Sequence, residues 1–239
     1  MRIDWNLLKI VALLFVIMGL YAFSNNRSNK KNVVRSKVEF LGDQNLYITE
    51  GAVNKLLIQN YGRLENVPKE NIVLNTIEKA LEANEMVKSA QVYVTIDGEL
   101  TSKIVQRKPI GRIEGDSKFY LDDEGKRMPF SSNYSARVPI ITGNITGKSL
   151  EDVYRILEFI NKDDFLRKNV IGIHIKAEDD YQLKFRLNQF VVNLGGIDNL
   201  EGKFSNFKAF YAKANKDNTL EDFAEVTLEF NNQVVCTKI

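Results

Sequence analysis

The chain begins with a hydrophobic run at residues 7–23, and this run limits what the rest can fold into. Apart from Lys9, the stretch LLKIVALLFVIMGLYAF carries no charged side chain. As a helix it would extend roughly 25 Å at about 1.5 Å per residue, the short end of what a membrane span needs. A helix that is apolar on every face has no polar side to turn toward water. The sequence therefore predicts an N-terminal transmembrane helix.

The predicted membrane anchor is made of the large apolar side chains of this run: Leu7, Ile10, Leu13, Leu14, Phe15, Ile17, Leu20 and Phe23. A cleaved secretory signal is the alternative, since Arg2 and Lys9 form a basic start and small residues flank Phe23. The run is longer than the roughly 7–15 residues of a signal core, which favours an uncleaved anchor. Both interpretations place the following residues outside the cytoplasm, although more basic residues follow the run than precede it, contrary to the positive-inside rule.

Composition limits the remaining chain, about 215 residues, to one large or two small domains. The sequence is 44% hydrophobic and 27% charged, which is typical of a folded protein. A net charge of +2 gives no electrostatic case for nucleic-acid binding. The single cysteine, Cys236, excludes an internal disulfide and a multi-cysteine metal site.

Periodicity predicts two domains of the α+β class after the run. Thr49 is placed to cap a first helix, a second helix follows at about 72–84, and Val92 begins an alternating pattern typical of strands. The first domain thus reads strand, helix, helix, strand, strand. The second reads as a mostly antiparallel sheet with two covering helices, which begin near Ser149 and Asp198. The predicted segments are a leader at 1–6, the transmembrane helix at 7–23, a tether at 24–32, and domains at 33–109 and 110–239.

The cluster Asp122-Asp123-Glu124 is the strongest candidate for catalysis in the sequence, because paired carboxylates can supply a general acid and a base. The same residues end at Gly125, a composition typical of a solvated hairpin turn, which we favour. His174 alternates with isoleucines, so it is predicted on a strand surface and not as a catalytic base.

Two other patterns lack features that a functional site would need. Gly195-Gly196 precedes a helix but lacks a phosphate-binding motif, and the basic residues around Pro109 lack interleaved aromatics. No serine has an obvious base to activate it. The sequence therefore predicts a protein that is not an enzyme and that has no cofactor, no metal site, no nucleic-acid partner and no small-molecule substrate.

The final strands, at about 223–230 and 233–238, are rich in β-branched and aromatic residues. No proline or lysine between Phe223 and Cys236 would blunt a sheet edge. Such strands either pair inside the sheet or accept an extended segment of a partner through backbone hydrogen bonds. The sequence leaves both possibilities open.

Short motifs recur along the chain in a characteristic order and spacing: Val38-Glu39-Phe40-Leu41-Gly42, Ile48-Thr49-Glu50, Gln106-Arg107-Lys108-Pro109-Ile110, Tyr120-Leu121-Asp122-Asp123-Glu124-Gly125 with Pro129, Val138-Pro139-Ile140-Ile141-Thr142-Gly143, and Val192-Asn193-Leu194-Gly195. In this order and spacing the whole chain resembles the bacterial cell-division family FtsQ/DivIB, and the Tyr120–Phe130 and Phe230–Val235 stretches are most similar to its Bacteroidetes version. The resemblance implies that the domain at 33–109 is a POTRA domain and that the domain at 110–239 is the β domain.

The resemblance also implies a non-catalytic divisome scaffold that spans the inner membrane once, with its bulk in the periplasm at the division septum. Its expected partners are FtsB- and FtsL-type proteins at the β domain and other divisome components at the POTRA domain. The residues that match the family's FtsB-binding strand are Val226, Thr227, Leu228, Glu229, Phe230, Asn231 and Asn232.

Some positions depart from the family pattern. Thr227 and Glu229 stand where an aspartate and an arginine are common, and Gln106 stands where a glutamate is common before Arg107. Pairing through the backbone does not depend on these side chains. A side-chain salt bridge with the partner does depend on them, so it is not expected here. Two alternative functions stay open at this point: an envelope hydrolase that uses Asp122–Glu124, and a POTRA-containing module of an export apparatus.

Overall fold

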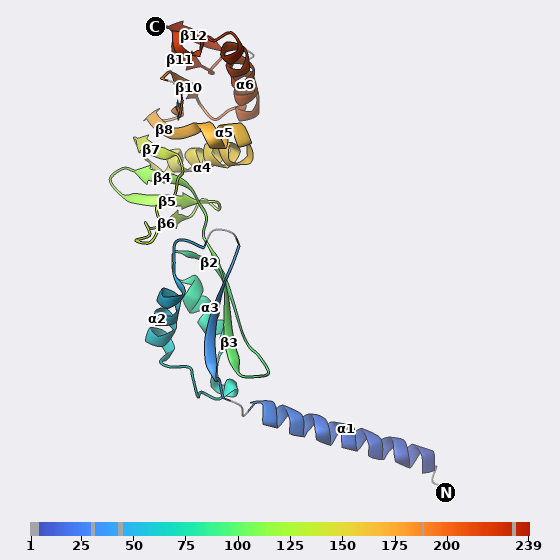
Figure 1. The fold of residues 1–239 in the computed structure, drawn as a ribbon. Coiled ribbons are helices and arrows are strands. Elements are labelled where there is room, and N and C mark those ends of the chain that lie inside the picture. Colours follow the sequence, from blue (N-terminus) through green and yellow to red (C-terminus); the bar gives the residue numbers. More distant parts are fainter. Residues whose placement is uncertain (1–4, 30–31, 43–44, 188, 231–232) are drawn as a thin grey trace. The chain divides into compact units, whose positions relative to one another are not determined.

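The computed structural model describes residues 5–29, 32–42, 45–187, 189–230 and 233–239 (Figure 1). The chain divides into two compact units, Met1–Gln106 and Arg107–Ile239. The fold class is α+β, with helices and strands in both units. The predicted leader at 1–6 falls mostly outside the described residues.

The N-terminal helix α1 (Trp5–Asn29) is longer than the predicted span, because it continues through the polar sequence SNNRSN that was expected to form part of a tether. Its described apolar side chains are exposed, Phe15 at 72% and Leu20 at 63% among them. From Lys9 to Phe23 this surface is roughly 22 Å long, less than the ~30 Å hydrocarbon core of a bilayer.

Within the described residues, no helix combines the length and the apolarity that a membrane crossing requires. This finding overturns the predicted transmembrane helix at 7–23. The correction covers all of the predicted anchor residues: Leu7, Ile10, Leu13, Leu14, Phe15, Ile17, Leu20 and Phe23.

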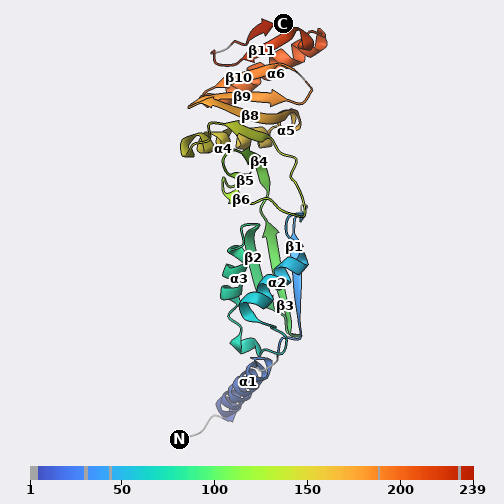
Figure 2. The same ribbon diagram turned by 90° about the vertical axis from the view of Figure 1, so that its left-hand side faces the viewer.

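The rest of the N-terminal unit is a three-stranded sheet with two helices on one face, as Figure 2 shows. The element order is β1 (Arg35–Leu41), α2 (Glu50–Tyr61), α3 (Leu74–Glu82), β2 (Val87–Val94) and β3 (Glu99–Gln106), with a 3-10 turn at Lys69–Asn71. Strand β3 lies in the centre, parallel to β1 and antiparallel to β2. The predicted order of strands and helices is confirmed, and Thr49 caps α2 by accepting a hydrogen bond from Ala52 N at 3.2 Å.

The core of this unit forms where α2 and α3 cover the sheet. Leu57 and Leu81 pack against Leu100 and Ile104, and all four are at most 3% exposed. At the end of β3, the buried Gln106 connects the sheet to the segment before α2. Its Oε1 accepts hydrogen bonds from Tyr47 N at 2.9 Å and Ile48 N at 3.3 Å, and its Nε2 donates to Ile48 O at 2.9 Å.

The C-terminal unit is a nine-stranded sheet in the order β12-β11-β10-β9-β8-β7-β4-β5-β6. Its elements are β4 (Pro109–Glu114), β5 (Lys118–Asp122), β6 (Arg127–Met128), β7 (Ile140–Gly143), α4 (Gly147–Lys162), α5 (Asp164–Asn169), β8 (Val170–Ala177), β9 (Asp180–Phe185), β10 (Val191–Gly195), α6 (Leu200–Lys216), a 3-10 turn at Leu220–Asp222, β11 (Phe223–Thr227) and β12 (Val235–Lys238). Neighbouring strands are antiparallel except at three places. The pairs β4–β7, β7–β8 and β10–β11 are parallel, and helical crossovers connect the last two pairs.

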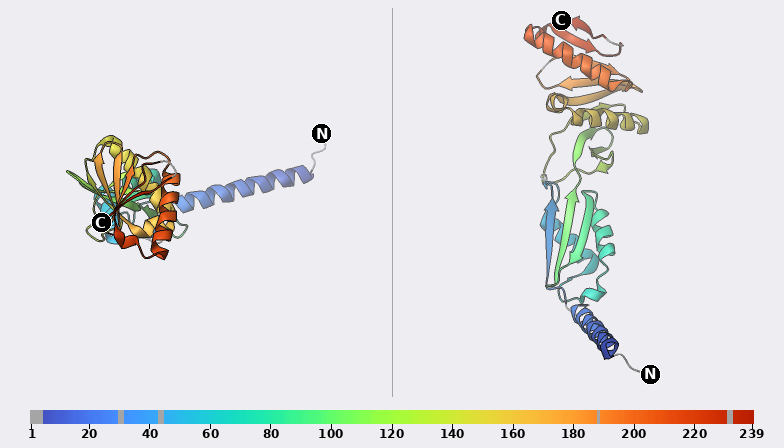
Figure 3. Two further views of the ribbon diagram at one scale, coloured as in Figure 1. Left: turned by 90° about the horizontal axis from the view of Figure 1, so that it is seen from above. Right: turned by 90° about the vertical axis from the view of Figure 1, so that its right-hand side faces the viewer.

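All three helices of this unit cover one face of the sheet. In Figure 1 they lie to the right of the strands, and in the right-hand view of Figure 3 they lie in front of them. Tyr181 joins the two layers, because its hydroxyl donates a hydrogen bond to Asp152 Oδ2 of α4 at 2.9 Å. Burial and the neighbouring Asp152 carboxylate raise the pKa of Tyr181, so it remains a neutral donor.

Two predicted helix starts in this unit need correction, and one short helix was not predicted. Helix α4 begins three residues earlier than expected, with a capping box formed by Thr146 and Ser149, while Asp152 faces Tyr181. Helix α6 is capped by Asn199 and not by Asp198. The short helix α5, capped by Asp163, was not predicted because six residues are too few to show a helical period.

The Gln106 side chain generates a stability prediction for the N-terminal unit. In Gln106→Glu a carboxylate would face Ile48 O without a proton to donate, leaving a buried carbonyl unsatisfied. We expect the free energy of unfolding at neutral pH to fall by about 1–3 kcal/mol, as measured by urea titration. The matched control is Gln91→Glu, an exposed position in β2 that lies opposite Lys103 of β3, and its effect should be near neutral. Equal stabilities for the two variants would contradict the assigned role of Gln106.

Candidate functional site

The C-terminal edge of the nine-stranded sheet is the first candidate site. Strand β12 pairs only with β11, so among the described strands its outer side has no neighbour. Val235 is 43% exposed, and Thr237 and Lys238 are also exposed. A strand with unpaired backbone donors and acceptors can accept an extended segment from another chain.

Strand β11 is held in place from inside the sheet. Val226 is fully buried, and Leu228 N donates a hydrogen bond to Asn193 O of β10 at 2.8 Å. Gly195 ends β10 at a φ of +64°, and a Cβ there would lie 2.5 Å from Glu229 Cγ. A glycine is favoured at this position both by its left-handed backbone conformation and by the close approach of the Glu229 side chain.

The structure separates the predicted partner-binding residues into different environments. Val226 and Thr227 lie in β11, which pairs with β10 on one side and with β12 on the other. Leu228 is 1% exposed. Glu229 lies against Gly195, and Phe230 is 49% exposed. Asn231 and Asn232 lie outside the described residues. The segment therefore leads into the free edge, whereas the edge itself belongs to β12.

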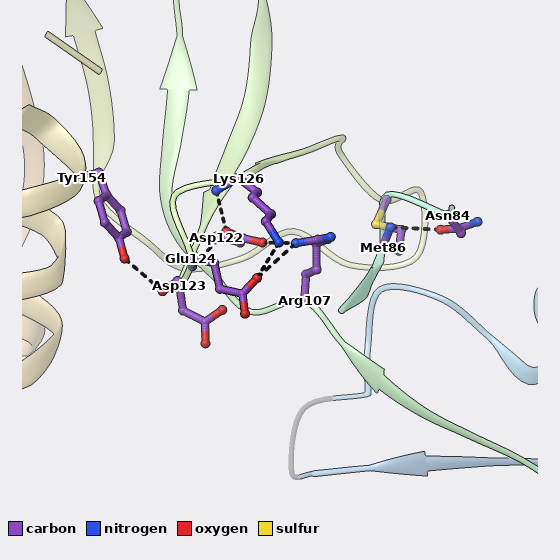
Figure 4. A network of polar contacts seen from close by, with 8 residues as sticks. All are labelled: Asn84, Met86, Arg107, Asp122, Asp123, Glu124, Lys126 and Tyr154. Carbon is purple, nitrogen blue, oxygen red and sulfur yellow. Dashed lines mark hydrogen bonds and ion pairs between the residues drawn. The ribbon is translucent and has the colours of Figure 1, made fainter. Parts of the chain in front are cut away.

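The acidic cluster forms the turn between β5 and β6, shown in Figure 4. The Asp122 side chain is fully buried, and its Oδ2 accepts a hydrogen bond from Arg107 NH1 at 2.7 Å. Its Oδ1 accepts from Glu124 N at 2.9 Å and Lys126 N at 2.7 Å. Both oxygens are thus engaged in holding the turn closed.

The neighbouring residues complete this arrangement. Glu124 forms ion pairs with Lys126 at 2.9 Å and with Arg107 at 3.8 Å. The Tyr154 hydroxyl of α4 donates to Asp123 O at 3.3 Å, and its ring lies against Gly125, whose φ is +74°. The cluster therefore forms a turn, as favoured from the sequence, and Asp122 neutralises the nearly buried Arg107.

His174 and Cys236 are the remaining residues with potential reactivity. His174 is exposed on β8, as predicted, and its Nδ1 lies 3.0 Å from Thr142 Oγ1. Burial raises the pKa of the Cys236 thiol, which lowers its reactivity. Among the described residues, no group of three His, Cys, Asp or Glu side chains is placed to hold a metal ion.

Comparison with known families decides which protein family this fold represents. The family described as FtsQ/DivIB, C-terminal related, matches residues 108–237, more than half of the chain. The chain belongs to the FtsQ/DivIB family. A POTRA-like domain matches residues 42–105 of the same FtsQ/DivIB protein. A comparison with curated individual proteins found no match.

Membership fits a scaffold role in cell division at the septum, through interactions with divisome proteins in general. The FtsQ/DivIB family is generally non-catalytic. The buried, fully engaged Asp122 agrees with that character, since a general acid or base must reach its substrate.

The ion pair in the β5–β6 turn generates a prediction. Asp122→Asn would remove the buried counter-charge of Arg107, whose side chain is 13% exposed, and leave it the more exposed Glu124 at 3.8 Å. We expect the free energy of unfolding to fall by about 1–3 kcal/mol, because a nearly buried charge loses its short, buried partner. Chemical denaturation would measure the loss, with the exposed Asp116→Asn as the matched control. A loss no larger than that of the control would show that the pair does not hold the turn.

Proposed function

We propose that this FtsQ/DivIB protein binds FtsB- and FtsL-type division proteins by strand addition at its C-terminal hairpin. The site consists of the edge strand β12 together with the segment Val226–Asn232 that leads into it. The single observation that carries the proposal is that, among the described strands, β12 pairs on one side only. The POTRA-like domain is proposed to contact other divisome components.

The orientation of the backbone amides in β12 supports this proposal. Ile239 N donates a hydrogen bond to Asp222 O, next to β11, at 3.0 Å. Since alternate residues of an extended strand direct their N–H groups to the same side, the N–H groups of Cys236 and Lys238 face away from β11. These two donors are available to the backbone carbonyls of an incoming strand.

Internal pairing at Leu228 determines which variant is informative. A proline at Leu228 would remove the hydrogen bond to Asn193 O and disturb a buried side chain. It would therefore test folding more than binding. A proline at Lys238 removes an outward N–H at an exposed residue and leaves the donor of Ile239 in place.

The decisive experiment compares Lys238→Pro with Lys238→Ala in the full-length protein. We expect Lys238→Pro to weaken binding of a purified FtsB- or FtsL-type partner by at least roughly tenfold, because one ladder hydrogen bond is lost and the edge is distorted. Lys238→Ala keeps the N–H group and should bind within about twofold of the wild type. Titration by isothermal calorimetry measures both, and the melting temperature of each variant checks folding.

Two outcomes would refute strand addition at β12. One is undiminished partner binding by a folded Lys238→Pro protein. The other is an equal loss in both variants, which would assign binding to the lysine side chain instead of the backbone.

A further inference from the structure

The uncovered face of the nine-stranded sheet contains a hollow of about 730 Å³. Its lining residue Lys184 is exposed, whereas the preceding Leu183 is buried in the core beneath the helices, so the hollow lies on the face opposite the helices. Figure 2 views the sheet from this side. The register places Ile140, Gly172, Lys184 and Val191 side by side across β7, β8, β9 and β10. Gly172 alone in this row has no side chain, and the space it leaves forms part of the hollow.

The next row of residues along the same strands forms a hydrogen-bonded wall. Thr142 Oγ1 lies 3.0 Å from His174 Nδ1, and Gln182 Nε2 donates to Asn193 Oδ1 at 2.6 Å. These contacts fix the side chains before any ligand arrives. A wall that is already ordered reduces the entropy cost of binding.

The charged side chains that line the hollow are both basic. Its charged lining residues are Lys184 and Arg186, both exposed, and no acidic residue contributes to the lining. Arg186 Nε donates to Lys168 O at 3.2 Å, which orients the guanidinium without neutralising it. Across the described part of the chain, neither side chain forms an ion pair with a carboxylate. The hollow therefore favours an anionic group.

Its floor favours an apolar group as well. Ile140 is 45% exposed beside Gly172, and Val191 lies on the other side of Lys184 in the same row. An aliphatic side chain above Gly172 would remove this surface from water. A ligand that fits both features carries a carboxylate next to an apolar side chain.

We propose that this hollow binds an acidic segment of a partner protein, with an apolar side chain over Gly172 and a carboxylate at Lys184 or Arg186. The inference goes beyond the proposed strand addition, because the lining residues lie in β7–β10 and none belongs to β12. Occupancy of the hollow and pairing at the edge can therefore be tested separately.

The test uses full-length protein and a fluorescein-labelled peptide of the sequence Glu-Leu-Glu-Phe-Glu, with Gln-Leu-Gln-Phe-Gln as the neutral probe. Fluorescence anisotropy measures binding of each peptide as a function of salt concentration. We expect the acidic peptide to bind at least roughly tenfold more tightly than the neutral one, and its affinity to decrease as salt increases.

Two lining variants locate the site. In Gly172→Val the added Cβ would meet Ile140 O at 3.4 Å and Lys184 Cβ at 3.5 Å, which are ordinary contacts, so the backbone has room for a Cβ, and the γ-methyl groups serve to fill the hollow. Lys184→Glu reverses a charge on its rim. We expect each variant to weaken binding of the acidic peptide by roughly tenfold without lowering the melting temperature.

The matched control is Lys213→Glu, an exposed lysine on α6 in the helical layer, which changes the net charge equally away from the hollow. Unchanged binding in this variant supports the proposal. The proposal is overturned if both lining variants bind as the wild type does, or if the neutral peptide binds equally well. Two further results would overturn it. Binding of the wild type to anionic vesicles that is lost in the lining variants, with no change in peptide binding, would assign the face to lipid. Self-association that depends on Lys184 would assign it to a second copy of the chain.

Discussion

Coverage of the nine-stranded sheet on a single face is the constraint on which the functional surfaces of this protein depend. Helices α4, α5 and α6 bury one side of every central strand, with Phe204 and Phe207 of α6 at most 1% exposed. A sheet covered on one face keeps its second face and its edges available. The β12 edge and the hollow at Gly172 both exist because, among the described elements of this unit, helices cover only the other face of the sheet.

Helix α6 also decides where the sheet ends. Strands β10 and β11 are parallel, and a parallel pair needs a crossover of a dozen or more residues, which α6 supplies. After that crossover, the β11–β12 hairpin completes the described sheet. Strand β12 is thus an edge strand among the described strands, a position suited to pairing with another protein in a family of division scaffolds.

The acidic turn shows how a catalytic pattern in sequence can have a structural cause. Asp122 bonds to two backbone amides and to Arg107, so the carboxylate is needed for the turn and for neutralising a buried charge. Gln106 is a similar case: an amide both donates and accepts at Tyr47 and Ile48, which a glutamate cannot do when ionised. Sequence reasoning noted the departure at Gln106 but had no signal for its two-sided hydrogen bonding.

The sequence by itself determined the element order of the first domain, the position of the long helices and the family, since these depend on local periodicity, capping and motif order. It misjudged the N-terminal run, because an apolar pattern shows composition but not the extent of the helix that forms. Tertiary structure alone decided that Val226 and Thr227 lie inside the sheet while β12 has the free edge. It also decided that Gly172 opens a basic hollow beside Lys184. Strand neighbours depend on pairing between distant segments, which no local pattern encodes.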